Sequence, residues 1–213
     1  MAVGAVIFDF NGTLSHDEPI LLALFQELFA EHGKPLAAKT YFDELAGLSD
    51  PEIVRAWLGA DHPAVAEVIA ERTRRYQALV ADGSSVPEDV RVAVRYAAER
   101  VPLAIVSGAM RAEIEPVVEA AGLADILSTI VAAEDVTRGK PDPEGYVRGL
   151  GLMGGEIAPS DTLVFEDTEA GITAAKAAGM RCIAVLGTLA PERLAAADEI
   201  VPALDVGVME RLL

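Results

Sequence analysis

The residues best suited to chemistry are polar side chains that directly follow short apolar runs. Asp9, Ser107 and the pair Glu166-Asp167 each come at the end of such a run. Short apolar runs bounded by turn residues are typical of buried parallel strands. Because ligands bind at the carboxyl ends of strands in open α/β sheets, we expect these side chains to share one edge. A carboxylate held there can act as a nucleophile toward an anionic group bound by backbone N–H donors.

The turn after the first run has the residue types that such a site needs. Asp9 is followed by Phe10, Asn11, Gly12 and Thr13. Gly12 lets the chain turn at once, and the Thr13 hydroxyl can hydrogen-bond back to the turn. The plainer interpretation is a strand that ends in a solvated Asp. The other motifs decide between this interpretation and a functional site.

Two carboxylates and two hydrogen-bond donors predict a site for a metal ion and a phosphate group. Asp9 and Asp167 are hard oxygen ligands of the kind that Mg²⁺ takes together with substrate phosphate. The Ser107 hydroxyl and the Gly108 N–H can donate to a phosphate oxygen. The plainer alternatives are that Ser107-Gly108 is only a turn and that Glu166-Asp167 complements a helix dipole.

Lys140 provides the positive charge that this cluster lacks. It lies in a stiff, turn-rich stretch, Gly139-Lys140-Pro141-Asp142-Pro143, just before a predicted helix. A lysine facing carboxylates would offset their repulsion and hold a phosphate. The alternative is a solvated surface lysine, but the chain has only four lysines, at 34, 39, 140 and 176.

Composition excludes several partners and suggests a compartment. The chain has 213 residues, 52% of them hydrophobic, and a formal net charge of −17. An acidic surface repels nucleic acid and anionic lipid, so we expect neither as a partner. Cys182 is the only cysteine, which favours a reducing compartment such as the cytoplasm and a buried apolar role for the thiol. The N-terminus lacks a basic leader, and its apolar run is too short to span a bilayer. Oligomeric state cannot be read from the sequence.

The order of predicted elements indicates an α/β fold with a helical insertion. Apolar runs at residues 3–8, 102–106, 129–132, 162–165 and 181–186 are expected to be strands. Because they alternate with predicted helices, they imply a parallel, Rossmann-like sheet. Between residues 16 and 82 only helices are expected, beginning with one that Asp17 caps and that continues to about His32. Six of the eleven aromatic residues are expected to form a small core of this insertion: Phe25, Phe29, Tyr41, Phe42, Trp57 and Tyr76. We therefore expect a core domain of residues 1–15 and 83–213 and an all-α domain of residues 16–82.

The motifs resemble the four ordered motifs of the haloacid dehalogenase-like (HAD) hydrolase superfamily. The matching stretches are Asp9–Leu14, Val106–Gly108, Gly139–Pro143 and Phe165–Met180, so the resemblance covers nearly the whole chain. Glu18-Pro19 and Gly47-Leu48-Ser49 also resemble the α-helical cap of the phosphoglycolate phosphatase and β-phosphoglucomutase branch. The resemblance implies a HAD fold with a small all-α cap domain inserted after the first strand.

The resemblance also implies roles for the site residues. Asp9 would attack phosphorus and form an aspartyl-phosphate. Mg²⁺ would be held by Asp9, the backbone carbonyl of Asn11 and Asp167, with Glu166 close by, while Ser107 and Lys140 would hold the phosphoryl oxygens. Phe10, Thr13 and Gly108 belong to the same substrate-binding turns. The activity implied is that of a Mg²⁺-dependent phosphatase acting on a small phosphorylated metabolite.

Asn11 departs from the family pattern, which has an Asp two residues after the nucleophile. That Asp protonates the leaving group and then activates water, and a carboxamide cannot carry the proton. Loss of a positioned acid–base group lowers the reaction rate by about 10²–10⁴. The sequence therefore predicts slow turnover, or turnover restricted to substrates with good leaving groups such as acyl phosphates. It also predicts that Asn11→Asp raises the turnover rate roughly a hundredfold. An engineered change, deamidation at Asn11-Gly12 and a substitute base at His16 stay open as alternatives.

Other activities fit less well but are not all excluded. A phosphomutase would need an intact acid–base and an Arg near Asp50-Pro51-Glu52, and a phosphonate hydrolase would need a lysine after Gly47. A haloacid dehalogenase would not need the acidic pair Glu166-Asp167. The main rival is a catalytically impaired HAD-fold protein that binds phosphate or metal without turnover, and only the site can decide this.

Overall fold

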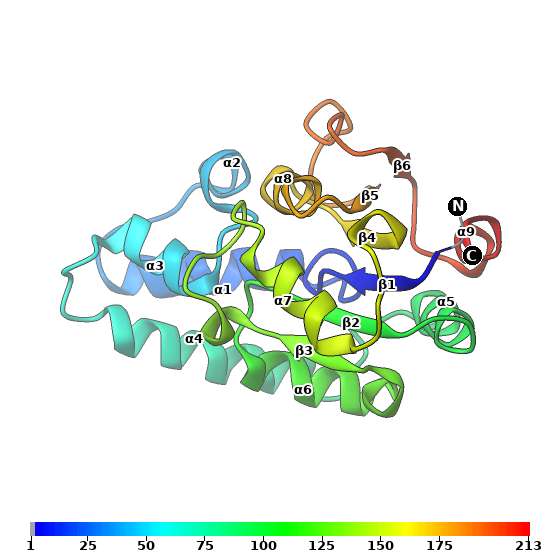
Figure 1. Cartoon of the computed structure of the whole chain (residues 1–213). Helices are drawn as coiled ribbons and strands as arrows, with labels where there is room; N and C mark the ends of the chain where they lie inside the picture. Colours follow the sequence, from blue (N-terminus) through cyan, green and yellow to red (C-terminus); the bar gives the residue numbers. More distant parts are fainter. Residues whose placement is uncertain (1–2) are drawn as a thin grey trace.

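A six-stranded, fully parallel sheet forms the centre of the molecule (Figure 1). The computed structural model describes residues 3–213. The strand order is β3-β2-β1-β4-β5-β6, with the bounds β1 Ala5–Phe8, β2 Leu103–Val106, β3 Thr129–Val131, β4 Thr162–Glu166, β5 Arg181–Val185 and β6 Glu199–Val201. In the register, Phe8 pairs with Ile105 of β2 and with Phe165 of β4. The carboxyl ends of β1, β2 and β4 therefore lie side by side, with β1 in the middle.

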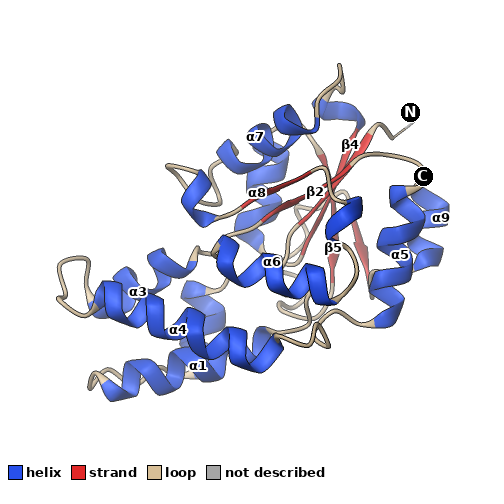
Figure 2. Ribbon diagram, turned by 90° about the horizontal axis from the view of Figure 1, so that it is seen from below, coloured by secondary structure: helices blue, strands red, loops and turns tan. Residues whose placement is uncertain are grey.

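Helices cover both faces of the sheet (Figure 2). Successive strand residues point to opposite faces, so each strand contributes to two cores. Val6 and Phe8 pack into one core with α5 (Glu88–Ala98), α6 (Arg111–Ala120) and α9 (Val206–Leu212). Ile7 points the other way and packs with α7 (Glu144–Met153) and α8 (Glu169–Ala177). Burial on both faces explains why the strands read as continuous apolar runs.

The chain leaves the sheet after β1 and forms helices α1–α5 before it returns at β2. Of these, α5 packs on the sheet, whereas the four preceding helices stand beyond the carboxyl ends of the strands (Figure 2). Their bounds are α1 Glu18–Glu31, α2 Ala38–Thr40, α3 Asp50–Leu58 and α4 Val65–Val80, with a π-helical turn at Tyr41–Leu45. We call residues 16–82 the insertion.

The insertion has its own apolar core, as expected, with one exception. Phe25, Phe29 and Tyr41 are fully buried in it, and Phe42 and Trp57 pack against it. Tyr76 instead belongs to the core on the sheet. Because Tyr76 is part of α4, this packing joins the insertion to the sheet domain, and the Tyr76 hydroxyl donates to Asp17 within the insertion.

The predicted strands are confirmed, but β6 and α9 were missed. β6 has only three residues, too few to show a period, and its position at the sheet edge leaves Ile200 partly exposed.

The predicted capping role of Asp17 is wrong: its side chain makes no cap hydrogen bond to α1, because it accepts from Asn11, Ser15 and Tyr76 instead. Cys182 is buried as predicted. No helix within residues 3–213 is both long and apolar enough to cross a membrane.

A buried ion cluster ties the insertion to the sheet domain. Arg72 of α4, only 1% exposed, pairs with Glu113 of α6 and lies 2.8 Å from Oδ2 of Asp50 in α3. Its guanidinium also stacks on Phe25 and Tyr76, 5.2 and 5.1 Å from the ring centres. Two carboxylates thus share one buried cation, and none of the three residues is stable there without its partners.

We expect Arg72→Met to lower the free energy of unfolding by about 3–5 kcal/mol, because it leaves two buried carboxylates without a cation. Urea unfolding at neutral pH measures this change. Arg74→Met is the matched control, since the Arg74 side chain on the same helix is 68% exposed and should change stability by less than about 0.5 kcal/mol. Equal losses in the two variants would contradict the role of the buried cluster.

Candidate active site

Asp9 stands at the end of the central strand, where both neighbouring strands also end. Its backbone N–H donates to the Phe165 carbonyl at 2.9 Å, which fixes the residue against β4. The side chain is buried, with 7% exposed. Burial raises the pKa of Asp9 to about 7, and the Glu166 carboxylate adds to this, while the Lys140 ammonium opposes it. The position and burial of Asp9 agree with a carboxylate that faces an internal cavity.

Lys140 lies between Asp9 and Glu166 and pairs with both. It extends from the loop before α7, and its ammonium lies 5.2 Å from the ring centre of Tyr146. The sequence analysis expected Lys140 to face the carboxylates, with a solvated surface lysine as the alternative, and the structure brings the lysine and the two carboxylates together. Proximity to the two carboxylates raises the pKa of Lys140, so the side chain is charged at neutral pH.

Both oxygens of Glu166 are already occupied by donors. Oε2 accepts from the backbone N–H groups of Asp167 and Thr168, at 3.0 and 3.2 Å, and from the Thr168 hydroxyl. Oε1 accepts from Lys140 and from the Tyr146 hydroxyl. A side chain at Gly171 would collide with this carboxylate, since a Cβ there would lie 1.7 Å from Oε1. Glu166 therefore orients Lys140 more readily than it offers a free metal ligand.

One oxygen of Asp167 accepts no hydrogen bond from the described residues. Oδ1 accepts from the Thr13 hydroxyl at 3.1 Å, whereas Oδ2 is buried without a hydrogen-bond partner among residues 3–213. A Cβ at Gly12 would lie 2.0 Å from Oδ2, and the φ of +76° also requires glycine there. Burial and the charge of Asp9 raise the pKa of Asp167 well above its usual value. A buried carboxylate oxygen in this state calls for a cation or a proton.

The acidic cluster fits a divalent metal ion, with Asp9 and Asp167 as its available carboxylates and Glu166 close by. Ligand oxygens of Asp9, Glu166 and Asp167 lie within 4.8 Å of one another. The set contains only oxygen donors, and one of them, Asp167 Oδ2, is unsatisfied. Mg²⁺ binds such hard donors through one or two carboxylates, keeping other positions for water and phosphate. The residues present therefore suit Mg²⁺ well.

The predicted phosphate-binding residues lie beside this cluster. Ser107 follows β2, and its hydroxyl oxygen accepts from the Ala109 N–H at 3.1 Å, which leaves the hydroxyl proton free for a ligand. Gly108 lies against the backbone of the insertion, where a Cβ would come within 3.0 Å of Ser49 Cα. Of the other residues predicted to touch the substrate, Phe10 has its side chain in the core and Thr13 directs its hydroxyl to Asp167. Only the backbone of Phe10 can therefore face a ligand.

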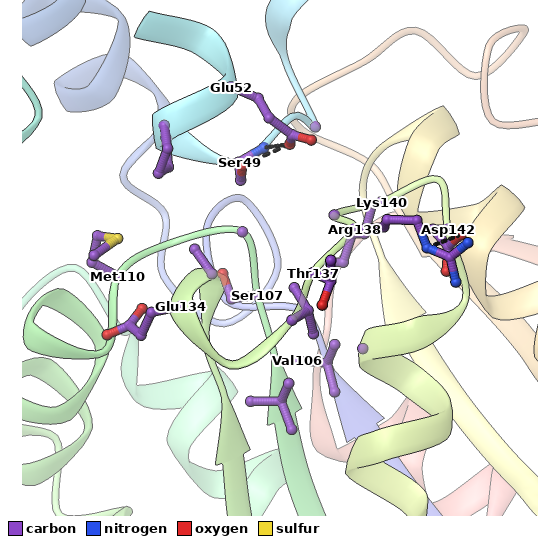
Figure 3. Close-up of a pocket in the computed structure, with 18 of the residues that line it drawn as sticks. Ser49, Glu52, Val106, Ser107, Met110, Glu134, Thr137, Arg138, Lys140 and Asp142 are labelled. Atoms are coloured by element: carbon purple, nitrogen blue, oxygen red, sulfur yellow. Dashed lines mark hydrogen bonds and ion pairs between the residues drawn. The ribbon is translucent and has the colours of Figure 1, made fainter. Parts of the chain in front are cut away.

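Two cavities share lining residues at this site. The smaller, about 40 Å³, is lined by Asp9, Asn11, Ser107 and Lys140 and also by Glu18, Tyr41 and Asp50 of the insertion. The larger, about 290 Å³, shares Ser107, Gly108 and Lys140 with it. Figure 3 shows Ser49, directly before α3, and Glu52 of α3 facing Ser107 and Lys140 across the larger cavity. A phosphoryl group matches the smaller space, and the rest of a small metabolite matches the larger.

Asn11 donates from Nδ2 to Oδ2 of Asp17 at 2.9 Å. Asp17 is fully buried, and Ser15 and Tyr76 also donate to the same oxygen. Burial raises the pKa of Asp17. The carboxamide at position 11 is thus matched to a carboxylate at position 17, a pairing that the sequence did not reveal because both residues had plausible local roles.

Several other residues at the site were missed or misplaced from sequence. Glu18 and Tyr41 were assigned to the insertion without a role at the site, whereas Asp50 was named among the polar residues of the insertion that could face the cleft. All three line the cavity that holds Asp9. His16, the suggested substitute base, is exposed and does not line that cavity. The only available signal for Glu18 was its position in the resemblance to the cap motif.

We expect Asn11→Asp alone to lower the free energy of unfolding by about 1–3 kcal/mol, because it replaces a donor by a second carboxylate opposite buried Asp17. Asn11→Asp combined with Asp17→Asn should recover most of this loss, since the amide then donates in the reverse direction. A double-mutant cycle by urea unfolding measures the coupling. Additive losses would contradict the pairing. The simple gain in turnover predicted for Asn11→Asp from sequence ignores this neighbour.

The raised pKa values also predict how pH affects stability. Between pH 4.5 and about 7 the folded protein retains a proton on Glu18 that the unfolded chain has lost, because burial raises the pKa of Glu18 from 4.5 to about 7. The same holds for Asp9 between 3.8 and about 7. Unfolding then releases protons, so the metal-free protein should lose stability as pH rises from 5 to 8.

Thermal unfolding in EDTA across this range measures the effect, and Mg²⁺ should raise the Tm more at pH 8 than at pH 5, since protons compete for its ligands. Glu18→Gln should reduce the slope of Tm against pH. A Tm of the metal-free protein that rises steadily from pH 5 to 8 would contradict this expectation.

Comparison with known proteins agrees with this geometry. The sequence profile of the family described as haloacid dehalogenase-like hydrolase matches residues 6–185. Validoxylamine A 7'-phosphate phosphatase of Streptomyces hygroscopicus subsp. limoneus is 33% identical over 207 residues, covering 90% of each chain. Protein CbbY of Rhodobacter capsulatus is 30% identical over 195 residues, covering 86% of this chain and 85% of CbbY.

Solved structures give the same result. A mutant of CbbY from Rhodobacter sphaeroides, in complex with xylulose-(1,5)bisphosphate, superposes with a TM-score of 0.84 at 27% identity and covers 95% of both chains. The chain belongs to the haloacid dehalogenase-like hydrolase family and is a phosphatase-type hydrolase of the branch that contains phosphoglycolate phosphatases, CbbY proteins and β-phosphoglucomutases.

Proposed function

We propose that the protein is a Mg²⁺-dependent phosphatase that forms an aspartyl-phosphate on Asp9. The observation that carries this proposal is the cluster of Asp9, Lys140 and Asp167 at the carboxyl ends of β1 and β4. It combines a buried carboxylate on the central strand, a lysine paired with it and an unsatisfied carboxylate oxygen beside it. Phosphoryl transfer needs positioning and charge neutralisation, and this cluster supplies both.

Each residue has a defined part in the proposed reaction. Asp9 attacks phosphorus in line with the leaving oxygen, while Lys140 and the Ser107 hydroxyl hold the phosphoryl oxygens. Mg²⁺, when bound by Asp9, Asp167 and the Asn11 carbonyl, would offset the charge of the phosphoryl group and the carboxylates. Glu166 keeps Lys140 in place through the contacts of its Oε1. Because the carboxamide of Asn11 has no proton that it can transfer, the leaving group must receive one from elsewhere or leave unprotonated.

The proposed substrate is a small phosphorylated metabolite of the sugar or cyclitol kind. Two named relatives act on, or bind, phosphate esters of polyhydroxylated carbon skeletons. The larger cavity, about 290 Å³, has charged residues on both walls, including Glu52 and Arg55 of α3 and Glu134 on the opposite side. Such side chains suit hydroxyl groups rather than an apolar leaving group.

We further propose that residues 16–82 act as a cap on a core of residues 1–15 and 83–213. Glu18, Tyr41 and Asp50 of the insertion line the cavity that contains Asp9, so closure of the insertion would exclude water from the phosphoryl group. The two chain crossings near residues 15 and 83 would serve as the hinge. A reducing compartment, with the cytoplasm as the default, fits the single buried thiol of Cys182.

A second candidate is a phosphate- and metal-binding protein without turnover, which the carboxamide at position 11 favours. It would bind phosphate esters in the presence of Mg²⁺ and release no phosphate. The same assay separates the two candidates, because binding and release are measured independently.

We expect the protein to release phosphate from acetyl phosphate and 4-nitrophenyl phosphate in the presence of Mg²⁺ but not of EDTA. Asp9→Asn should lower this activity by at least about 10³-fold, because the nucleophile is lost. Asp125→Asn, at an exposed site, is the matched control and should keep full activity. Activity that survives Asp9→Asn would reject the aspartyl-phosphate mechanism, and Mg²⁺-dependent phosphate binding without any release would favour the binding protein.

A further inference from the structure

The proposed phosphatase lacks a proton carrier at the position where its family has one. Asn11 cannot donate or accept a proton in the reaction, and its amide is already engaged with Asp17. A leaving alkoxide nevertheless needs a proton, and the attacking water must lose one. The question is which side chain at the same cavity can carry that proton, and the answer rests on the proposed function.

Glu18 has the placement that this role requires. It is the first residue of α1 and lines the 40 Å³ cavity together with Asp9, Ser107 and Lys140. The side chain is half-buried rather than sealed in the core. Tyr41 Oη donates to Oε2 at 3.1 Å, and Oε1 has no hydrogen bond to another side chain among residues 3–213. One carboxyl oxygen is therefore held and the other is available to a ligand in the cavity.

The other ionisable residues of this cavity are excluded by their partners. Lys140 is shared between Asp9 and Glu166. Asp50 lies 2.8 Å from buried Arg72 and belongs to the ion cluster that joins the insertion to α6. Burial and the Glu18 carboxylate raise the pKa of Tyr41 well above 10, so Tyr41 does not ionise near neutral pH.

The nearby residues outside the cavity are also excluded. Asp17 is fully buried behind Asn11 and does not line the cavity. His16 is exposed and does not line it either. Among residues 3–213, three carboxyl groups line this cavity: Asp9, Glu18 and Asp50. Asp9 belongs to the metal cluster and pairs with Lys140, and Asp50 pairs with Arg72. Glu18 is thus the one without such a partner.

We propose that Glu18 is the general acid and base that takes over the function of the missing aspartate at position 11. In the first step, an Asp9 oxygen forms a bond to phosphorus, the bond from phosphorus to the leaving oxygen breaks, and Glu18 gives its proton to that oxygen. In the second step, ionised Glu18 takes a proton from water as the water oxygen bonds to phosphorus and the bond to Asp9 breaks. Inorganic phosphate leaves, and both carboxyl groups return to their initial states.

The electrostatic surroundings of Glu18 agree with this cycle. Burial raises its pKa to about 7, and the carboxylates of Asp17 and Asp9 add to the shift. The Tyr41 hydrogen bond and the Arg72 guanidinium oppose it. A group with a pKa near the working pH is present in both protonation states, which is the condition for efficient acid–base catalysis. Turnover then need not be slow, in contrast to the expectation from Asn11 alone.

The test compares Glu18→Gln with the unaltered protein on substrates that differ in their need for a proton. Phenyl phosphate has a basic leaving group, 4-nitrophenyl phosphate a weaker base of the same shape, and acetyl phosphate a leaving group that needs no proton. We expect hydrolysis of phenyl phosphate to fall by about 10²–10⁴ and that of 4-nitrophenyl phosphate to fall less. Because the second step also needs a base, the variant should accumulate phosphorylated Asp9 from acetyl phosphate, detected by intact mass.

Two results would overturn the proposal. One is hydrolysis of phenyl phosphate by Glu18→Gln at the rate of the unaltered protein. The other is a folded Glu18→Gln variant that no longer forms phosphorylated Asp9 from acetyl phosphate, since that would show a role in binding rather than in proton transfer. A failure of the proposed function looks different, because the unaltered protein itself would then neither become phosphorylated on Asp9 nor release phosphate.

Two further variants complete the experiment. Glu18→Asp retains a carboxyl group and should hydrolyse phenyl phosphate faster than Glu18→Gln; equal rates would count against proton transfer, and this comparison holds even if one variant is less stable. Glu27→Gln is the matched control, because Glu27 lies on the same helix with its side chain 64% exposed. It should keep full activity on all three substrates.

Discussion

The ion pair of Lys140 with Asp9 and Glu166 is the interaction on which the site depends. Asp9, Glu166 and Asp167 bring three carboxylates into one buried volume, and like charges at this distance repel strongly in a medium of low dielectric constant. One ammonium group offsets only part of the charge of three carboxylates, and burial, together with the neighbouring carboxylates, raises the pKa values of Asp9 and Asp167. The remaining deficit of positive charge is what makes the site attractive to a divalent cation and its bound phosphate.

The topology explains why these residues meet. β1 is the central strand, with β2 and β4 beside it in parallel register, so the residue that ends β1 is within reach of both neighbouring turns. Lys140 comes from a loop far along the chain and reaches the same point from the α7 side of the sheet. Gly12 and Gly171 are needed because carboxylates lie where their side chains would be. The acidic cluster is thus a consequence of strand order and of two close backbone approaches.

The insertion contributes chemistry as well as cover. The chain leaves the sheet directly after the turn at Asn11, so its first helix delivers Glu18 to the cavity that holds Asp9. Arg72 then connects α4 to α6 through a buried ion pair, which couples the helices of the insertion to the sheet domain. Residues of this first helix therefore lie within reach of the cavity beside Asn11, where Glu18 can supply a proton that a carboxamide cannot.

The sequence by itself determined the fold class, the helical insertion and the identity of the residues at the strand ends. Continuous apolar runs mark strands buried on both faces, and the polar residues that follow them mark the edge where ligands bind. Five of the six strands could be predicted in this way, and β6 could not because three residues at an edge show no pattern. The family resemblance then supplied roles for Asp9, Asp167 and Lys140.

Only the tertiary structure decided how these residues are partnered. Asn11 donates to Asp17, and Asp50 is paired with Arg72 and so is not available as an acid or base. Glu18 is held by Tyr41 through one oxygen only. These contacts join residues whose local sequence patterns are unrelated. From the sequence Asp17 was predicted to be a helix cap, because its residue type suits the start of a helix, and Glu18 was noted only in the resemblance to the cap motif. Burial and hydrogen-bond partners distinguish the Asp17 side chain from that of Glu18. Both properties are determined by the packing of the insertion against the sheet.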